Sequence, residues 1–188
     1  MSFRRSGRRV SVRTPASRRA IVLATVWCYH PVMSTRGCRD REIDAWRAFL
    51  KAYAVVLRAL ERELQERHGI PLTWYDVLVH LEAAPQGRLR MQALADSLVL
   101  SRSGVTRVVD RMVQAGLVER VSYREDRRGT WAVITPEGRR MLREAAPDHL
   151  QGVYRHFLRH LRPRDLAELH RMMERVIAGE EAAVPSQG

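Results

Sequence analysis

The chain has 188 residues, 45% of them hydrophobic, which is enough to bury the core of one domain with extensions. Its formal net charge of +12 is uneven, because residues 1–39 carry nine arginines and no acidic residue, whereas residues 40–188 carry 24 basic and 21 acidic residues. The two cysteines, Cys28 and Cys38, exclude a disulfide framework and favour a reducing, cytoplasmic compartment.

Residues 1–39 are expected to form a basic, disordered tail. Residues 17–27 imitate a secretion signal, with paired arginines before an apolar run from Ala20 to Trp27. That run is too short to cross a bilayer and no cleavage motif follows it, so no membrane partner is expected. Met33 is an alternative start of translation, and the sequence leaves open whether residues 1–32 are translated.

Residues 40–70 have the pattern of one long helix that ends near His68 and Gly69. Its apolar residues recur at steps of three and four, which places them on one narrow stripe. A stripe of this kind predicts packing against other helices. Its members are Ile43, Trp46, Leu50, Tyr53, Leu57, Leu60 and Leu64.

The segment GIPLT interrupts this pattern and precedes a second helix. Thr73 is expected to cap that helix, with Asp76 in its first turn. Val77, Leu78 and Leu81 form the predicted inner face. The helix is expected to stop before residues 85–87, Pro-Gln-Gly.

Two shorter helices follow, at residues 91–98 and 101–116, joined by a tight turn. Ser101 is a favourable N-cap, and Gly116 suits the left-handed residue just past the helix end. The predicted inner faces comprise Leu94, Ala95 and Leu98 in the first helix and Val105, Val108, Val109 and Met112 in the second.

The segments LVERVS and WAVIT alternate in the manner of strands and are joined by a charged loop, which predicts a β-hairpin. Thr135 and Pro136 then restart a helix as its cap and first residue. Pro147 lies early enough to kink this helix, and Pro163 separates it from a last one. The expected inward residues are Met141, Leu142, Ala145, Leu150, Val153, Phe157 and Leu161, followed by Leu166, Leu169, Met173 and Val176.

A short helix, a tight turn and a second helix form the helix-turn-helix arrangement, whose second helix lies in the DNA major groove. The second helix here begins SRSGVTR, with small, hydroxyl and guanidinium side chains opposite the valines. An arginine can bind guanine through two hydrogen bonds, and Gly104 would allow close approach to a phosphate. The candidate DNA-contacting residues of this helix are Ser101, Arg102, Ser103, Thr106 and Arg107.

The loop of the hairpin, YREDRRGTW, concentrates arginine beside Gly129. A two-stranded ribbon beyond a recognition helix can reach the neighbouring minor groove, where an inserted arginine is favoured. Asp126 is interpreted as a partner that orients Arg128 or the loop backbone. The alternative is a solvated charged turn. The candidate wing residues are Arg124, Asp126, Arg127 and Arg128.

The run from LADSL to ITPEG closely resembles the MarR family of bacterial winged-helix transcriptional regulators, and the resemblance extends over roughly residues 40–178. Its most specific parts are LSRSGVTRVVDRM, the following GLVER, the D-R-R of the wing and ITPEG. Trp131 departs from the family pattern, which more often has a smaller residue there. The resemblance implies a mostly α-helical fold with a small β-hairpin, in which a winged helix-turn-helix domain accompanies a helical dimerisation region.

On this interpretation the chain is organised into five segments. A dimerisation helix (40–70) follows the tail (1–39), and a DNA-binding domain (71–136), two C-terminal dimerisation helices (137–180) and a frayed end (181–188) come after it. The resemblance implies an obligate homodimer on double-stranded DNA, reading a pseudo-palindrome with half-sites about 10 bp apart. Repression is the family's common mode.

Many members of the family release DNA when a small aromatic or anionic effector binds between the dimer helices and the winged domain. The candidate lining residues of such a cleft are Trp46, Tyr53, Trp74, Tyr75 and His80, although core packing is an alternative role for each. A thiol switch is not expected, because residues 40–188 contain no cysteine.

No cofactor, metal site or catalytic residue is predicted. His156 and His160 share a helical face at i, i+4 but have no acid or cysteine nearby in sequence, which favours a solvated face. The chain lacks a phosphate-binding loop and a nucleophile elbow. A remaining alternative of another class is a winged helix that docks on a protein and does not bind DNA.

Overall fold

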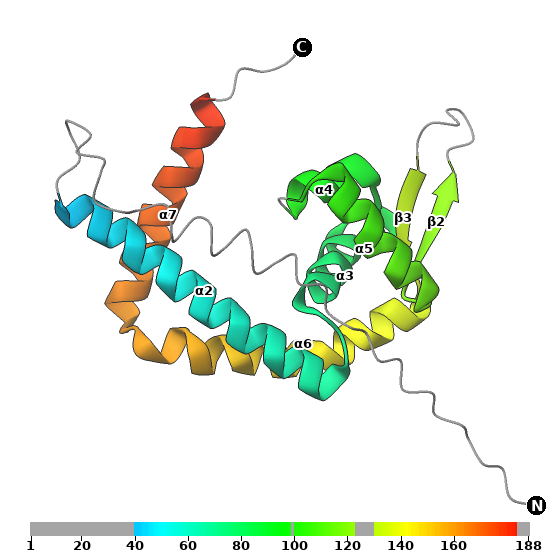
Figure 1. The fold of residues 1–188 in the computed structure, drawn as a ribbon, viewed down its shortest axis with the longest axis horizontal. Helices are drawn as coiled ribbons and strands as arrows, with labels where there is room; N and C mark the ends of the chain where they lie inside the picture. The colour runs from blue at the N-terminus through cyan, green and yellow to red at the C-terminus, as the bar shows by residue number, and fades with distance from the viewer. Residues whose placement is uncertain (1–39, 99, 123–129, 184–188) are drawn as a thin grey trace, which may run out of the picture. The chain divides into compact units, whose positions relative to one another are not determined.

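A computed structural model describes residues 40–98, 100–122 and 130–183 (Figure 1). The chain divides into two compact units, residues 1–55 and 56–188, and the boundary falls inside the long helix α2 (Asp40–His68). The expected wing residues 124 and 126–128 and both cysteines lie outside the described residues.

In the first unit, the N-terminal half of α2 carries a ladder of aromatic rings. The ring centroids of Trp46 and Phe49 are 5.8 Å apart, and those of Phe49 and Tyr53 are 6.4 Å apart. All three side chains are exposed. The helix thus presents a row of aromatic groups that this unit does not bury.

The second unit contains the rest of α2 and all later elements. These are α3 (Leu72–Ala83), a 3-10 turn (Pro85–Gly87), β1 (Arg88–Arg90), α4 (Met91–Ser97), α5 (Arg102–Gln114), β2 (Val118–Ser122), β3 (Thr130–Ile134), α6 (Pro136–His156), a second 3-10 turn (Leu158–His160) and α7 (Pro163–Ala183). The expected helix-turn-helix and hairpin are therefore present, and the last helix reaches beyond the predicted frayed boundary at 181.

The core of this unit lies among α3, α4, α5 and the sheet. The predicted inner faces of these helices are confirmed, since Val77, Leu78, Leu81, Leu94 and Val109 are all fully buried. Apolar burial of this kind provides the main stabilisation of the winged domain.

The sheet has three antiparallel strands in the order β1-β3-β2. The predicted hairpin is thus joined by a third strand, β1, which the sequence analysis missed. Arg88–Arg90 is only three residues long and is rich in arginine, so it lacks the apolar alternation that marks a strand.

The predicted start of α3 is wrong. Thr73 is buried inside the helix and Pro71 is the N-cap, with no side-chain cap from its own segment. The carboxylate of Glu61 on α2 instead accepts a hydrogen bond of 2.8 Å from the Leu72 N–H. A residue eleven positions earlier thus satisfies one of the free N–H groups at the helix start.

The starts of α5 and α6 follow the prediction. The Thr135 hydroxyl accepts from the Gly138 N–H at 3.0 Å and donates to the Gly116 carbonyl at 2.8 Å, so it caps α6 and ties it to the end of α5. Gly116 has the expected left-handed conformation, with φ of +74°.

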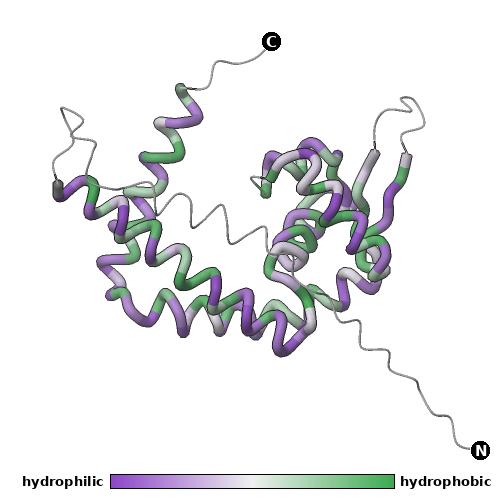
Figure 2. The backbone as a smooth tube through the Cα atoms, viewed as in Figure 1, coloured by the Kyte–Doolittle hydropathy of each residue, from purple (hydrophilic) through white to green (hydrophobic). Residues whose placement is uncertain are grey.

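The inward assignment is only partly correct for α6 and α7. Ala145 is buried, but Leu150 is 64% exposed and Val176 is 59% exposed. α7 has no buried residue, although Figure 2 shows hydrophobic and hydrophilic residues alternating along it. Both helices are amphipathic, and much of their apolar surface finds no partner within the described part of this chain.

Candidate nucleic-acid interface

The start of α5 is capped by the side chain of its own N-cap residue, Ser101. The Ser101 hydroxyl accepts a hydrogen bond of 3.1 Å from the Gly104 N–H, and its Oγ lies 3.2 Å from the Ser103 Oγ. A Cβ atom on Gly104 would lie 3.1 Å from that Ser101 Oγ, so the glycine gives the cap its space. This is a structural reason for Gly104 beside the expected approach to a phosphate.

The outward side of α5 carries the other predicted residues. Arg102, Ser103, Thr106 and Arg107 are exposed, whereas Val105 on the opposite side is buried. The Thr106 hydroxyl donates to the Arg102 carbonyl at 2.9 Å. Neither Arg102 nor Arg107 forms an ion pair within the described ranges, so two guanidinium groups project from the first two turns of this helix.

Arg120 of β2, which sequence reasoning missed, contacts α5 at two points. Its Nη2 lies 2.9 Å from an Asp110 carboxylate oxygen and donates to the Thr106 carbonyl at 3.3 Å. The two segments are ten residues apart, and no local pattern marks the pair. Arg120 therefore braces α5 against the hairpin, and Figure 1 shows these elements side by side.

Trp131, the departure from the family pattern, packs against two arginines of β1. The Arg88 guanidinium carbon lies 4.9 Å from a Trp131 ring centroid, and that of Arg90 lies 5.6 Å away. These are cation–π distances. The large side chain thus has a defined place on the sheet, on the strand that follows the wing.

The C-terminal half of α2 is held to α6 by two reciprocal clusters. Glu63 of α2 lies 2.7 Å from Arg155 and 2.8 Å from His156, both on α6. Hydrogen bonds from His156 and then from Arg155 lower the pKa of Glu63, against an opposing effect of burial. Gly152 permits the close approach, because a Cβ there would lie 2.8 Å from the Glu63 carboxylate.

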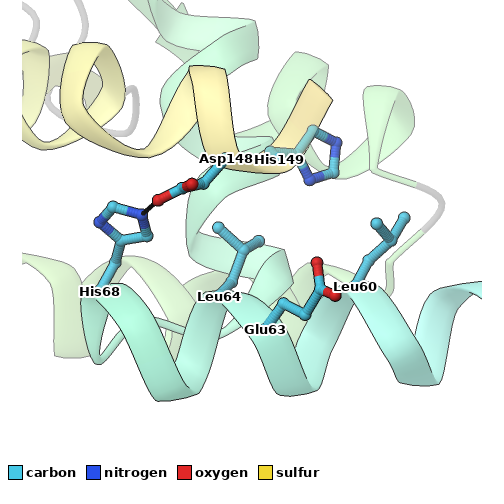
Figure 3. A pocket seen from close by; sticks show the side chains of 6 residues that line it. All are labelled: Leu60, Glu63, Leu64, His68, Asp148 and His149. Atoms are coloured by element: carbon cyan, nitrogen blue, oxygen red, sulfur yellow. Dashed lines mark hydrogen bonds and ion pairs between the residues drawn. The ribbon is translucent and has the colours of Figure 1, made fainter. Parts of the chain in front are cut away.

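The second cluster reverses the roles of the helices. Asp148 of α6 lies 2.7 Å from Arg67 of α2. It also lies 2.9 Å from His68 of the same helix, as Figure 3 shows. The hydrogen bond from His68 is the largest cause of a lowered pKa for Asp148. Together the two clusters hold the C-terminal half of α2 to α6 within the second unit.

This junction corrects the interpretation of the C-terminal histidines. His156 does have an acid beside it, Glu63, which lies 93 residues earlier in the sequence. His156 and His160 do not share a helix either, because α6 ends at His156 and a 3-10 turn contains His160. The described residues contain no group of three potential metal ligands.

The residues predicted to line an effector cleft are divided between the two units. Trp74 and Tyr75 lie in the core of the second unit, while Trp46 and Tyr53 belong to the first. His80 bonds through Nδ1 to the Asp76 carbonyl at 2.8 Å. What the structure adds is His149, whose ring centroid lies 4.3 Å from that of Tyr75.

His149 is a partly buried histidine of α6 beside these two clusters. Its Nδ1 is buried and has no hydrogen-bond partner among the described residues, and burial lowers the pKa of the ring. It lines a shallow notch whose other members are Leu60, Glu63, Leu64, His68 and Asp148 (Figure 3).

The lowered pKa of His149 predicts a loss of stability on acidification. The unfolded chain takes up the proton near the ordinary histidine pKa of about 6.5 before the folded chain does, so the free energy of unfolding should fall as pH drops below that value. Glu63 and Asp148 add a separate loss only below their ordinary pKa values of 4.5 and 3.8. Urea denaturation between about pH 7.5 and pH 5.5 measures the free energy of unfolding in the range where a histidine, and neither carboxylate, changes its protonation.

The matched variant for this measurement is His149→Phe, which keeps a ring against Tyr75 but cannot ionise. Its stability should depend less on pH than that of the wild type in this window, because the substitution removes the ring whose pKa burial lowers. If the free energy of unfolding depends on pH in the same way in both proteins, His149 is not the source of the stability loss.

Among the described helices, none has both the length and the apolar character required to span a membrane.

Comparisons with known proteins agree on one family. The model described as MarR family matches residues 68–129. The HTH-type transcriptional regulator MhqR of Bacillus subtilis (strain 168) is 35% identical over 110 residues, which cover 58% of this chain and 74% of that protein. AbsC, a MarR family transcriptional regulator from Streptomyces coelicolor, is 35% identical with a TM-score of 0.72, covering 79% of this chain and 99% of AbsC.

A second similar structure was determined with DNA bound to the relative. Sco3205, a MarR family transcriptional regulator from Streptomyces coelicolor, is 33% identical with a TM-score of 0.73, covering 81% of this chain and 94% of Sco3205, and its structure was determined in complex with DNA.

Proposed function

Because the chain belongs to the MarR family of transcriptional regulators, we propose that it binds double-stranded DNA sequence-specifically as a homodimer. The observation that carries this proposal is the capped start of α5, from which Arg102 and Arg107 project without ion-pair partners in the described ranges. The buried valines and the brace from Arg120 hold that surface in a fixed orientation. The DNA complex of Sco3205 supports the same type of ligand.

The proposal includes the wing and a regulatory mode. Arg124, Asp126, Arg127 and Arg128 would contact the minor groove beside the site read by α5. The regulator would repress transcription from a pseudo-palindromic operator and leave it when a small aromatic or anionic effector binds. Trp46, Tyr53, Trp74, Tyr75 and His80 remain the proposed effector residues.

Dimerisation is proposed from the exposed apolar side chains of the long helices. Large apolar groups that a chain leaves exposed together mark interaction surfaces. Dimerisation would bury them and place two copies of α5 on one duplex. The set comprises Trp46, Phe49 and Tyr53 on α2, Leu150 and Tyr154 on α6, and Met172, Val176 and Ile177 on α7.

The double substitution Val176→Arg/Ile177→Arg is predicted to raise the dimer dissociation constant by roughly a hundredfold or more, because it would bury unpaired charges in an apolar interface. Sedimentation equilibrium measures this directly. Glu180→Arg, an exposed change on the same helix, is the control and should leave the dimer intact. A double variant as dimeric as the wild type would contradict the role of α7 in the interface.

A further inference from the structure

The inner face of β2 changes from apolar to charged along the strand. Val118 and Arg120 both lie on this face, because side chains alternate along a strand and both residues are paired with buried residues of β3. Val118 belongs to the same buried core as Met112 of α5. The Arg120 guanidinium instead reaches polar groups of α5, which lies beside β2 (Figure 1). The strand thus holds the helix in two chemically different ways.

Arg120 contacts α5 at two acceptors that lie one helical turn apart. Its Nη2 is 2.9 Å from Asp110 Oδ1 and donates to the Thr106 carbonyl at 3.3 Å. The Thr106 hydroxyl in turn donates to the Arg102 carbonyl at 2.9 Å. A chain of polar contacts therefore runs from the sheet to the first turn of α5. Because its two acceptors are four residues apart on one side of the helix, Arg120 resists both rotation and sliding of α5.

The exposure of this ion pair limits its contribution to the stability of the fold. The side chain of Arg120 is 33% exposed and that of Asp110 is 50% exposed. Ion pairs of this kind add little to the free energy of unfolding, because water screens them. The valines on the opposite side of α5 are already held in the apolar core. A role in binding therefore fits the Arg120–Asp110 pair better than a role in folding.

Asp110 places a negative charge on the helix that is proposed to enter the major groove. It lies one turn after Thr106, a proposed DNA-contacting residue, and so on the same side of α5. An uncompensated carboxylate there would repel the DNA phosphates. Within the described ranges, Arg120 is the cation paired with Asp110, and the pairing cancels this charge.

The orientation of α5 matters more for base contacts than for phosphate contacts. An arginine binds guanine through two hydrogen bonds, and each of them weakens steeply when its angle is distorted. Attraction between an arginine and a phosphate depends on distance and varies slowly with a small displacement. A slight rotation of α5 would therefore lower the discrimination between DNA sequences more than the general affinity for DNA.

We propose that Arg120 is a positioning residue that determines the specificity of base recognition by α5 without contacting a base. It holds the helix through Asp110 and the Thr106 carbonyl, and it removes the charge of Asp110 from the surface that faces DNA. Arg102 and Arg107 then meet the base edges at the required angle. This inference rests on the proposed DNA-binding function.

The test compares affinity for two duplexes of equal length, one selected from a random library by the wild-type protein and one of random sequence. For Arg120→Ala, affinity for the selected duplex should fall by about thirtyfold and affinity for the random duplex by about threefold, within the range of coupling between contacting residues. The ratio of the two affinities should thus fall by about tenfold. A protein that is merely less stable would lose affinity for both duplexes by the same factor, because unfolding removes binding-competent molecules whatever the DNA sequence.

A charge-balanced double variant separates orientation from charge. Asp110→Asn/Arg120→Ala removes one charge of each sign, so it should bind the random duplex nearly as well as the wild type does. The slope of its log affinity against log salt should also equal that of the wild type. Its ratio of affinities should stay low, because the helix is still not held by Arg120.

Two further variants complete the comparison. Arg120→Lys keeps the positive charge but lacks the planar fork, so it should bind random DNA as the wild type does and still discriminate less well. It also provides the measurement if Arg120→Ala fails to fold. Arg143→Ala removes an exposed arginine of α6 and is the control for loss of one positive charge. Its ratio of affinities should equal that of the wild type.

Three outcomes overturn the inference while the proposed function stands. The first is a wild-type ratio of affinities in folded Arg120→Ala, or in Arg120→Lys if the alanine variant does not fold. The second is full discrimination in the double variant, which would leave Arg120 only as a counter-charge. The third is a salt slope shallower by about 0.9 per protomer in the double variant, which would make Arg120 a phosphate contact. If the wild-type protein binds neither the library nor the random duplex, the inference and the proposed function fail together.

Discussion

Replacing Arg102 and Arg107 together with alanine is predicted to weaken binding to the selected operator by roughly a hundredfold or more. Each bidentate arginine–guanine contact contributes about 1–3 kcal/mol of discrimination, and a dimer carries the contacts of two recognition helices. Both side chains are exposed, so the free energy of unfolding should change by less than about 0.5 kcal/mol. Fluorescence anisotropy with the operator and a scrambled duplex measures the effect.

The matched control is Arg111→Ala, on the last turn of the same helix. Recognition helices contact bases through their N-terminal residues, so Arg111 should matter much less than the pair at positions 102 and 107. Equal losses in the two variants would mean that α5 contributes only general positive charge. An unchanged operator affinity in Arg102→Ala/Arg107→Ala would remove α5 from the interface.

Gly138→Ala is predicted to destabilise the protein by about 2–3 kcal/mol, within the range for inserting atoms into a packed core. A Cβ atom at this position would lie 2.2 Å from the Leu117 carbonyl oxygen and 2.9 Å from Ile134 Cγ1. The first contact is with backbone and cannot be relieved by a rotamer change. The start of α6 would therefore have to move away from the loop that follows α5.

Gly179→Ala is the opposite case and serves as the control. This glycine lies inside α7, and a Cβ atom there would meet nothing within 4 Å. Its replacement should stabilise the helix by about 0.5–1 kcal/mol. Urea denaturation of both variants gives the two free-energy changes. Wild-type stability in Gly138→Ala would show that α6 does not approach the Leu117 carbonyl this closely.

Much of the winged domain could be predicted from the sequence because its signals are local. Ser101 and Thr135 cap helices through contacts three residues away, and Gly116 ends one through its own backbone conformation. The buried faces of α3 and α5 follow from helical periodicity alone. Each of these features depends on a short segment, so the residue pattern and spacing within that segment are sufficient to predict it.

The missed features all depend on residues distant in sequence. The Leu72 N–H at the start of α3 donates to Glu61 of another helix, whereas the local pattern predicts a cap at Thr73. Arg120 braces α5 from the sheet, and Glu63 finds its partners on α6. Periodicity assigns a side chain to one face of a helix but does not identify what packs on that face. It therefore predicts an inward Leu150, which the structure leaves exposed.

The two clusters between α2 and α6 suggest how a signal could reach the DNA-binding surface. Glu63 and Asp148 connect the long helix to α6, and His149 of α6 stacks on Tyr75 in the winged core. A change in the packing of α6 would therefore alter the packing of α3, which lies against α4 and α5.

The measurement to make first is selection of duplexes by the wild-type protein from a random DNA library at about physiological salt. A dimeric winged-helix regulator predicts enrichment of a pseudo-palindrome whose half-sites lie about one helical turn apart, with A·T-rich steps where the wings would reach. The Arg102→Ala/Arg107→Ala variant should fail to enrich it. No enrichment by folded, dimeric wild-type protein would contradict the account and favour a winged helix that docks on another protein.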